Sequence, residues 1–229
     1  MKNEFKGINP DAIMLMAENR FYNSKIFYDE NKETLKKEVT QPLYTLINDL
    51  YDDLYALDEE MCLIPSKMIS RFRRDTRFTK DKSLYRENLW IMFMRNKHQW
   101  QYQPCLWFEF FPQGMSWGVG IYNHSPAVME CFKKHLDEQG DEFLKALKSI
   151  EKAGGSPKIE SYKKDRSVGK DQRLKAYYNA KRFYLTKETD SLEKLFDGTV
   201  EKDLKKWIKA CTPMYKFLLG VMEEMYLQQ

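Results

Sequence analysis

The chain has 229 residues, of which 42% are hydrophobic and 14% aromatic, and its formal net charge is +4. This length suffices for one sizeable hydrophobic core, and we predict a single domain over residues 1–229. No apolar run approaches the roughly 20 residues needed to cross a bilayer, and no apolar targeting segment opens the chain, so we expect a cytoplasmic protein without membrane contact. The four cysteines are far apart in the sequence and are expected to be free thiols: Cys62, Cys105, Cys131 and Cys211.

The first sixty residues show helical spacing of apolar side chains. Asn9 can cap a helix and Pro10 can open it, and we expect this helix to end near Asn19. A second helix should begin near Ser24. Pro42 should kink or restart it, because proline lacks the backbone donor that a helix needs.

Strand patterns dominate the middle of the chain. We predict a strand over residues 68–73, a buried strand over 87–95, and a hairpin of residues 105–111 and 115–122 around Pro112-Gln113-Gly114. Short or edge strands are expected at residues 157–162 and 182–186. Neighbouring strands joined by short turns predict an antiparallel sheet of about four to six strands.

Further helices are expected after the hairpin. One should begin at Ser125-Pro126, another at Asp141, and a third should cover residues 171–180. Residues 201–226 should be mostly helical, interrupted by Pro213. With helices from both ends packed on the sheet, the predicted fold class is α+β.

Two glycines, Gly118 and Gly120, alternate along the second strand of the predicted hairpin and leave one of its faces without side chains. Either another part of the chain lies close to this face, or a ligand does.

The basic residues gather in two stretches. The stretch Arg71–Arg86 has only two acidic residues, Asp75 and Asp81, against seven basic ones: Arg71, Arg73, Arg74, Arg77, Lys80, Lys82 and Arg86. Residues 163–182 hold eight basic and two acidic side chains, and we interpret this second stretch as a solvated face.

Part of the first stretch resembles the signature of domain-of-unknown-function family 2461, found in bacteria and fungi. The resembling pattern is RDxRFxKDKxxY, formed by Arg74, Asp75, Arg77, Phe78, Lys80, Asp81, Lys82 and Tyr85. Residues 23–32, 107–122 and 213–215 also fit the family. Leu84 and Arg86 depart from it, where a proline and a lysine are usual. The resemblance implies the family's fold over most of the chain, and it implies no activity, because the family has none established.

We predict that the loop Arg71–Arg86 binds a small ligand that bears phosphate or carboxylate. Cations held close together repel one another, and two aspartates do not balance seven basic groups. The predicted ligand-binding residues are Arg73, Arg74, Asp75, Arg77, Lys80, Asp81, Lys82 and Tyr85. No cofactor is expected, and no catalytic residue is assigned. Enzymatic activity stays open, with Asp75 or Asp81 as a conceivable base and Tyr85 as a proton donor.

Three alternatives stay open. The loop can be an internal salt-bridge network without a ligand. The chain can bind nucleic acid, although a pI of about 8.6 and the interleaved aspartates disfavour this. It can also be a protein-interaction module, which would predict an exposed apolar patch. The oligomeric state is not determined by the sequence.

No metal site is predicted. The histidines are His98, His124 and His135, and Cys131 lies four residues before His135, so that these two can share a helix face. Two ligands do not make a site, and no acidic residue has the spacing typical of zinc ligands.

Overall fold

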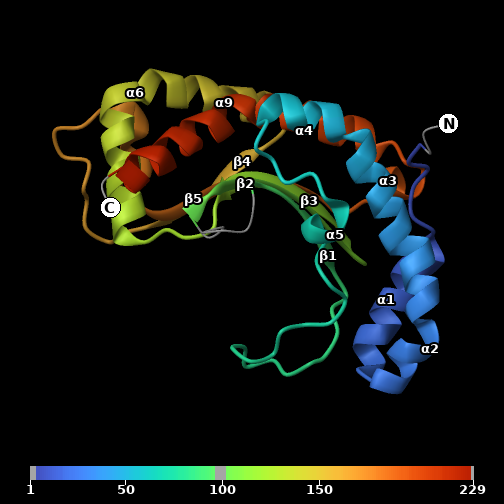
Figure 1. The fold of residues 1–229 in the computed structure, drawn as a ribbon. Coiled ribbons are helices and arrows are strands. Elements are labelled where there is room, and N and C mark those ends of the chain that lie inside the picture. Colours follow the sequence, from blue (N-terminus) through green and yellow to red (C-terminus); the bar gives the residue numbers. More distant parts are fainter. Residues whose placement is uncertain (1–3, 96–101, 228–229) are drawn as a thin grey trace. The chain divides into compact units, whose positions relative to one another are not determined.

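The computed structural model describes residues 4–95 and 102–227, and its fold is α+β. Five strands in these residues form one antiparallel sheet in the order β1-β2-β3-β5-β4 (Figure 1). The predicted fold class and antiparallel sheet are therefore confirmed.

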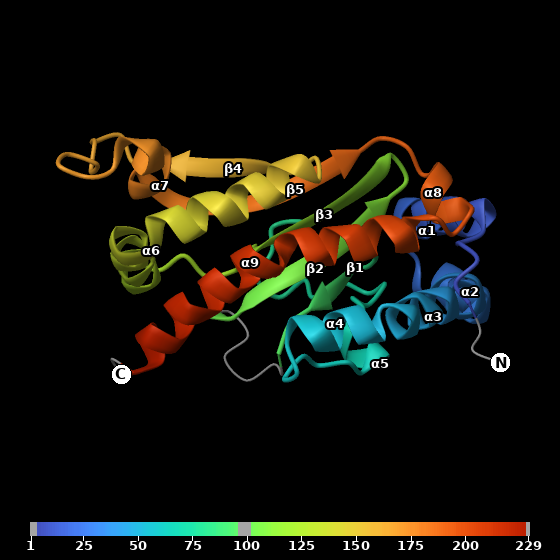
Figure 2. The same ribbon diagram turned by 90° about the horizontal axis from the view of Figure 1, so that it is seen from above.

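The strand predicted to be buried, β1, lies at one end of the described strand order, and its side chains alternate in burial. On β1, Leu89, Ile91 and Phe93 are buried, while Trp90 and Met92 between them are half-buried. The predicted hairpin is present as β2 and β3, and β4 pairs antiparallel with β5, with Ile159 opposite Phe183 (Figure 2). The strand bounds are Leu89–Phe93 for β1, Pro104–Phe111 for β2, Gly114–Ile121 for β3, Ser156–Ser161 for β4 and Ala180–Thr189 for β5.

The amino-terminal helices begin at the predicted signals. Asn9 accepts a hydrogen bond from the Asp11 backbone N–H at the start of α1, and Ser24 caps α2. Before Pro42 the helix adopts a π-helical turn, which accommodates the absence of a backbone N–H at proline. The bounds are Pro10–Tyr22 for α1, Lys25–Leu35 for α2, Lys36–Thr40 for the π-helical turn, Gln41–Asp49 for α3 and Tyr51–Leu57 for α4.

The strand predicted over residues 68–73 is wrong. Pro65 opens the short helix α5, Pro65–Met68, and beyond it only single bridges form, between Ile69 and Ile91 and between Arg73 and Tyr85. The Ser70 hydroxyl, 3.0 Å away, accepts the backbone N–H of Trp90. The Ser70 side chain therefore occupies the Trp90 N–H, which in a regular strand pair would donate to a backbone carbonyl.

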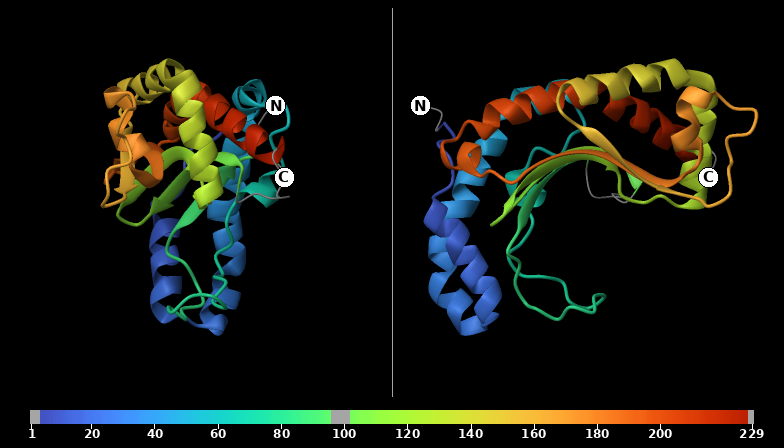
Figure 3. Two further views of the ribbon diagram at one scale, coloured as in Figure 1. Left: turned by 90° about the vertical axis from the view of Figure 1, so that its left-hand side faces the viewer. Right: turned by 180° about the vertical axis from the view of Figure 1, so that it is seen from behind.

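The later helices differ from the prediction in their extent. The two helices expected from Ser125 to Gly154 are both present, joined as α6, Pro126–Lys152, across a kink at Gln139, where the backbone is not helical (Figure 3). The helix expected over 171–180 shrinks to a 3-10 turn, Gln172–Leu174, and α7, Lys175–Tyr178, because β5 begins at Ala180. After α8, Glu193–Phe196, helix α9 runs from Val200 to Leu227, so the interruption predicted at Pro213 is wrong.

The contacts divide the chain into two compact units. The first unit is residues 1–92, 108–116 and 188–205, and the second is residues 93–107, 117–187 and 206–229. In the first unit, Leu35, Val39 and Leu43 are fully buried. In the second, Phe132 packs on Phe183 with ring centroids 4.6 Å apart. The single domain over residues 1–229 stays a prediction.

Two simpler expectations concern the cysteines and membrane contact. Cys62, Cys105, Cys131 and Cys211 form no disulfide in the described residues, and all but Cys62 are buried.

Among the described helices, none has the length and apolar character that crossing a membrane requires.

The bare face at Gly118 and Gly120 is covered by aromatic side chains of the same unit. A Cβ atom on Gly118 would overlap the Trp107 ring and lie 2.6 Å from the Leu185 carbonyl oxygen. A Cβ atom on Gly120 would lie 3.0 Å from Cβ of Tyr184, whose ring meets that of Trp107 edge to face. Close packing within the chain therefore accounts for both glycines.

We predict that Gly118→Ala lowers the free energy of unfolding by about 1–3 kcal/mol, because the new methyl group overpacks the space beneath Trp107. Urea denaturation of the purified chain measures this change. Ser156→Ala, at an exposed position of β4, is the control and should change stability by less than about 0.5 kcal/mol. Equal stability of Gly118→Ala and the unsubstituted chain would contradict the close packing.

Candidate anion-binding site

The stretch Arg71–Arg86 is an irregular antiparallel ribbon. The Arg74 backbone N–H donates to the Leu84 carbonyl at 2.8 Å, and the Arg86 N–H donates to the Phe72 carbonyl at 2.9 Å. Figure 1 shows the ribbon as the long teal segment without helix or strand that precedes β1. Its two arms therefore hold each other by backbone hydrogen bonds on both sides of the Arg73–Tyr85 bridge.

The ribbon docks on the turn between α1 and α2. Asn23 adopts a left-handed conformation there, with φ of 49°, and its Oδ1 accepts the Leu84 backbone N–H at 2.6 Å. Tyr85 is only 2% exposed, and its ring stacks on Tyr28 of α2 with centroids 4.8 Å apart. Burial raises the pKa of the Tyr85 phenol. Tyr85 is thus an apolar anchor of the ribbon.

Asp81 is the charged contact between ribbon and helix. Its carboxylate accepts hydrogen bonds from the backbone N–H of Ser83 at 2.9 Å and from the Ser83 hydroxyl. The carboxylate also binds Arg74 across the ribbon and, at 3.1 Å, Arg20 of α1. The Ser83 hydrogen bonds and then the Arg74 contact hold the pKa of Asp81 well below its usual range. Arg20 had no place in the sequence pattern, because it lies 61 residues away from Asp81.

Asp75 pairs with Arg77 at the exposed tip. The Arg77 Nη2 lies 2.7 Å from Oδ2 of Asp75, and Arg77 Nε lies 3.0 Å from Oδ1. These hydrogen bonds lower the pKa of Asp75 to about 2. Lys82 donates to the backbone carbonyl of Thr76 at 2.8 Å. The tip is therefore closed by its own side chains.

The eight predicted site residues do not meet at one point. Arg73 and Arg74 are consecutive in an extended arm, so their side chains leave opposite sides of the ribbon. Arg73 lies with Tyr85, whereas Arg74 lies with Asp81. The side chains of Arg73 and Lys80 are exposed, and in the described residues neither has an ion pair. The structure thus separates an Asp81 cluster, an Asp75–Arg77 pair and free surface cations.

Arg86 stands out among the basic residues of the stretch, although it was not among the predicted site residues. Its guanidinium is half-buried and lies over the Trp90 ring, 4.4 Å from the centroid. Its Nε is buried without a hydrogen-bond partner in the described part of the chain. Burial first, and then the charge of Arg74, lower the pKa of Arg86. The Arg86 guanidinium therefore feels the positive charge of Arg74 and has one buried N–H donor without an acceptor in the described residues.

Glu109 of β2 only partly balances this pair. Its carboxylate attracts Arg86 but accepts its hydrogen bond from the Asn88 side-chain amide. Within residues 4–95 and 102–227, no carboxylate lies within ion-pair distance of Arg86. The region around Arg74 and Arg86 is thus suited to an anion.

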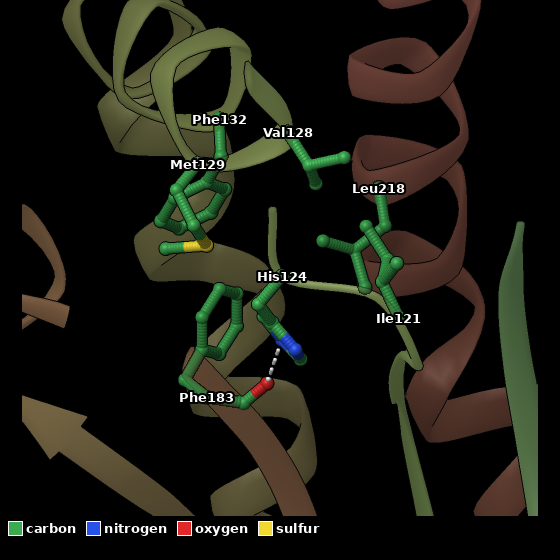
Figure 4. Close-up of a pocket in the computed structure, with 7 residues that line it drawn as sticks. All are labelled: Ile121, His124, Val128, Met129, Phe132, Phe183 and Leu218. Carbon is green, nitrogen blue, oxygen red and sulfur yellow. Dashed lines mark hydrogen bonds between the residues drawn. The ribbon is translucent and has the colours of Figure 1, made fainter. Parts of the chain in front are cut away.

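An apolar cavity in the second unit is not a ligand site. It is lined by Ile121, His124, Val128, Met129, Phe132, Phe183 and Leu218 (Figure 4). Its volume of about 10 Å³ has room for no more than a water molecule. His124 bonds through Nε2 to the Phe183 carbonyl at 2.9 Å, and burial lowers its pKa. His98 lies outside the described residues.

Large apolar side chains are exposed near the docked ribbon. Phe21 and Ile26, on either side of the α1–α2 turn, are 83% and 72% exposed, and Phe78 at the ribbon tip is 88% exposed. Phe21 follows Arg20, which contacts Asp81. Three large apolar side chains of the first unit are therefore exposed to solvent.

Together, the fold and the ribbon define an α+β protein whose arginine-rich signature loop docks on a helical hairpin. The chain belongs to a family described as conserved hypothetical proteins, DUF2461, whose family model matches residues 11–217. No curated protein matches the chain. The predicted family resemblance is therefore confirmed. The family description names no activity, so a function has to be inferred from the geometry of the site.

We predict that Asn23→Gly speeds hydrogen exchange of the Leu84 amide by about fivefold, since it removes a hydrogen bond worth about 1 kcal/mol. Glycine keeps the left-handed conformation, so the helix turn survives. Hydrogen exchange followed by NMR measures the effect. Asn31→Ala removes a side-chain hydrogen bond inside α2 and should leave the Leu84 amide unchanged. Unaltered exchange in Asn23→Gly would show that the ribbon does not depend on this contact.

Proposed function

We propose that the chain binds a small anion, bearing phosphate or carboxylate, at Arg74 and Arg86 on the Arg71–Arg86 loop. The observation that carries this proposal is the half-buried Arg86 guanidinium, whose buried Nε has no hydrogen-bond partner in the described residues and which the charge of Arg74 repels. A buried donor without an acceptor costs free energy, and so does the repulsion between neighbouring cations. An anion bound between the two groups would relieve both costs.

Charge balance supports a ligand over a purely internal network. Asp75 is occupied by Arg77, and Asp81 is shared by Arg74 and Arg20. These pairs use both carboxylates of the stretch. The internal network therefore accounts for the tip and for the contact with α1, but it leaves Arg86 uncompensated.

The geometry favours recognition by arginine rather than by a diffuse positive surface. Trp90 supports the Arg86 guanidinium from one face and thereby limits its orientation. A planar guanidinium offers paired N–H donors that match two oxygens of a phosphate or carboxylate. Extended nucleic acid would instead contact the exposed cations, Arg71, Arg73 and Lys80 among them.

A second candidate function is binding to an acidic, apolar segment of another protein. The exposure of Phe21, Ile26 and Phe78 supports it, because burial of large apolar side chains against a partner is favourable. The basic residues of the ribbon beside them would complement acidic residues of such a segment.

We predict that inorganic phosphate, citrate or a nucleoside monophosphate stabilises the chain against heat. A ligand at 100 times its dissociation constant adds about 2.7 kcal/mol of stability. Arg86→Lys should weaken this binding by at least about tenfold, because lysine keeps the charge but loses the paired donors. Thermal shift followed by isothermal titration calorimetry measures both effects.

Arg77→Ala is the matched control, since Arg77 is an exposed arginine of the same ribbon, paired with Asp75. It should bind the anion as the unsubstituted chain does. Absence of binding by all three anions, or equal binding by Arg86→Lys, would refute the proposal. Binding of a single-stranded oligonucleotide alone, weakening as salt rises, would support the nucleic-acid alternative instead.

A further inference from the structure

A second cluster of chemically active side chains lies in the second unit, between α6 and α9. His135 and Glu138 are three residues apart on α6 and so share a face of the helix. Glu224 comes from α9, and one ligand atom from each of the three residues lies within 4.8 Å of the others. The sequence pattern pairs His135 with Cys131 alone: Glu138, three residues further on, was overlooked, and no local spacing reveals Glu224, which lies 89 residues beyond His135.

His135 is a buried histidine whose ring is positioned by its neighbours. It is 8% exposed, and its Nδ1 lies 2.8 Å from Oε2 of Glu224 without the alignment of a hydrogen bond. The absence of a side chain at Gly220 makes room for the ring, since a Cβ atom there would lie 3.2 Å from Nε2. Phe217 meets the imidazole edge to face, with centroids 5.7 Å apart. Packing thus directs Nδ1 toward the carboxylates.

The Glu224 carboxylate already has two neighbours. Lys134 forms an ion pair with its Oε1, and Nδ1 of His135 lies 2.8 Å from its Oε2. A metal ion would take the place of the Lys134 ammonium group. Glu138 is exposed and lies next to the bend of α6 at Gln139, where it can turn toward the other two groups.

We propose that His135, Glu138 and Glu224 form a binding site for a divalent transition metal, with Zn²⁺ as the best match. Zinc accepts imidazole nitrogen and carboxylate oxygen at about 2.0–2.2 Å, which puts tetrahedral ligand atoms about 3.3 Å apart. Small rotations of the two glutamates would bring the cluster to that spacing. Three protein ligands leave a fourth position for water.

Two neighbours refine this assignment. Cys131 lies one turn before His135 on α6 and is not among the three residues whose ligand atoms lie together. Lys134 neutralises Glu224 in the metal-free chain and competes with the metal for that carboxylate. Removal of the Lys134 ammonium group should therefore strengthen metal binding.

Titration of ZnCl₂ into the full chain, stripped of metal with EDTA, tests the site by calorimetry. We expect one Zn²⁺ per chain and a higher melting temperature on binding. Glu138→Gln should weaken the affinity at least about tenfold. Glu223→Gln is the matched control, an exposed glutamate beside Glu224 on the same helix, and should leave the affinity unchanged.

Lys134→Met distinguishes this site from casual binding by surface carboxylates, because it should bind Zn²⁺ more tightly than the unsubstituted chain. Glu138 and Lys134 are exposed, so their substitution spares the core, and circular dichroism of the metal-free variants checks their fold. Failure of the unsubstituted chain to bind Zn²⁺, or equal affinity in Glu138→Gln, would overturn the proposal. The cluster would then be an ion-pair network that joins α6 to α9.

Discussion

Repulsion among the basic groups of the Arg71–Arg86 loop is the constraint on which its structure depends. Asp81 offsets this repulsion most directly. This carboxylate contacts guanidinium groups from two elements, Arg74 of the ribbon and Arg20 of α1. The hydrogen bonds from Ser83 keep it ionised. Asp81 thus offsets the repulsion between Arg74 and Arg20, and it joins the ribbon to the helical hairpin.

Charge orients the ribbon, but apolar contacts hold it. Exposed ion pairs add little stability, because water screens them and long side chains lose freedom. Burial of an aromatic ring such as that of Tyr85 contributes about 2 kcal/mol, and the Asn23–Leu84 hydrogen bond about 1 kcal/mol. With the backbone fixed in this way, Arg86 keeps a buried N–H donor without an acceptor in the described residues, and the charge of Arg74 repels it. These two costs are the physical basis of the proposed anion site.

The two proposed sites share a principle of construction. In each site, a residue outside the proposed binding set positions one of the binding side chains. Trp90 of β1 supports Arg86, and Gly220 of α9 leaves space for the His135 ring. In each, one charged group is already occupied by a neighbour of opposite sign, Asp81 by Arg20 and Glu224 by Lys134. A ligand would join these arrangements or compete with them.

The sequence by itself determined the α+β class, the hairpin of β2 and β3, the helix starts at Asn9 and Ser24, and the excess charge of the Arg71–Arg86 stretch. These features follow from local spacing, caps and turns, which a short window of residues contains. The strand expected at 68–73 is wrong because the short helix opened by Pro65 reaches Met68, and because the Ser70 hydroxyl, rather than a backbone carbonyl, accepts the Trp90 N–H.

Only the tertiary structure decided which side chains meet. Arg20 reaches Asp81 across 61 residues, and Glu224 reaches His135 across 89, and no periodicity in the sequence records either approach. The structure also places the basic residues of the signature on two sides of the ribbon. Consecutive side chains of an extended arm point in opposite directions, so Arg73 and Arg74 are separated. Composition shows how much charge a chain carries, whereas long-range packing sets the distances over which those charges act.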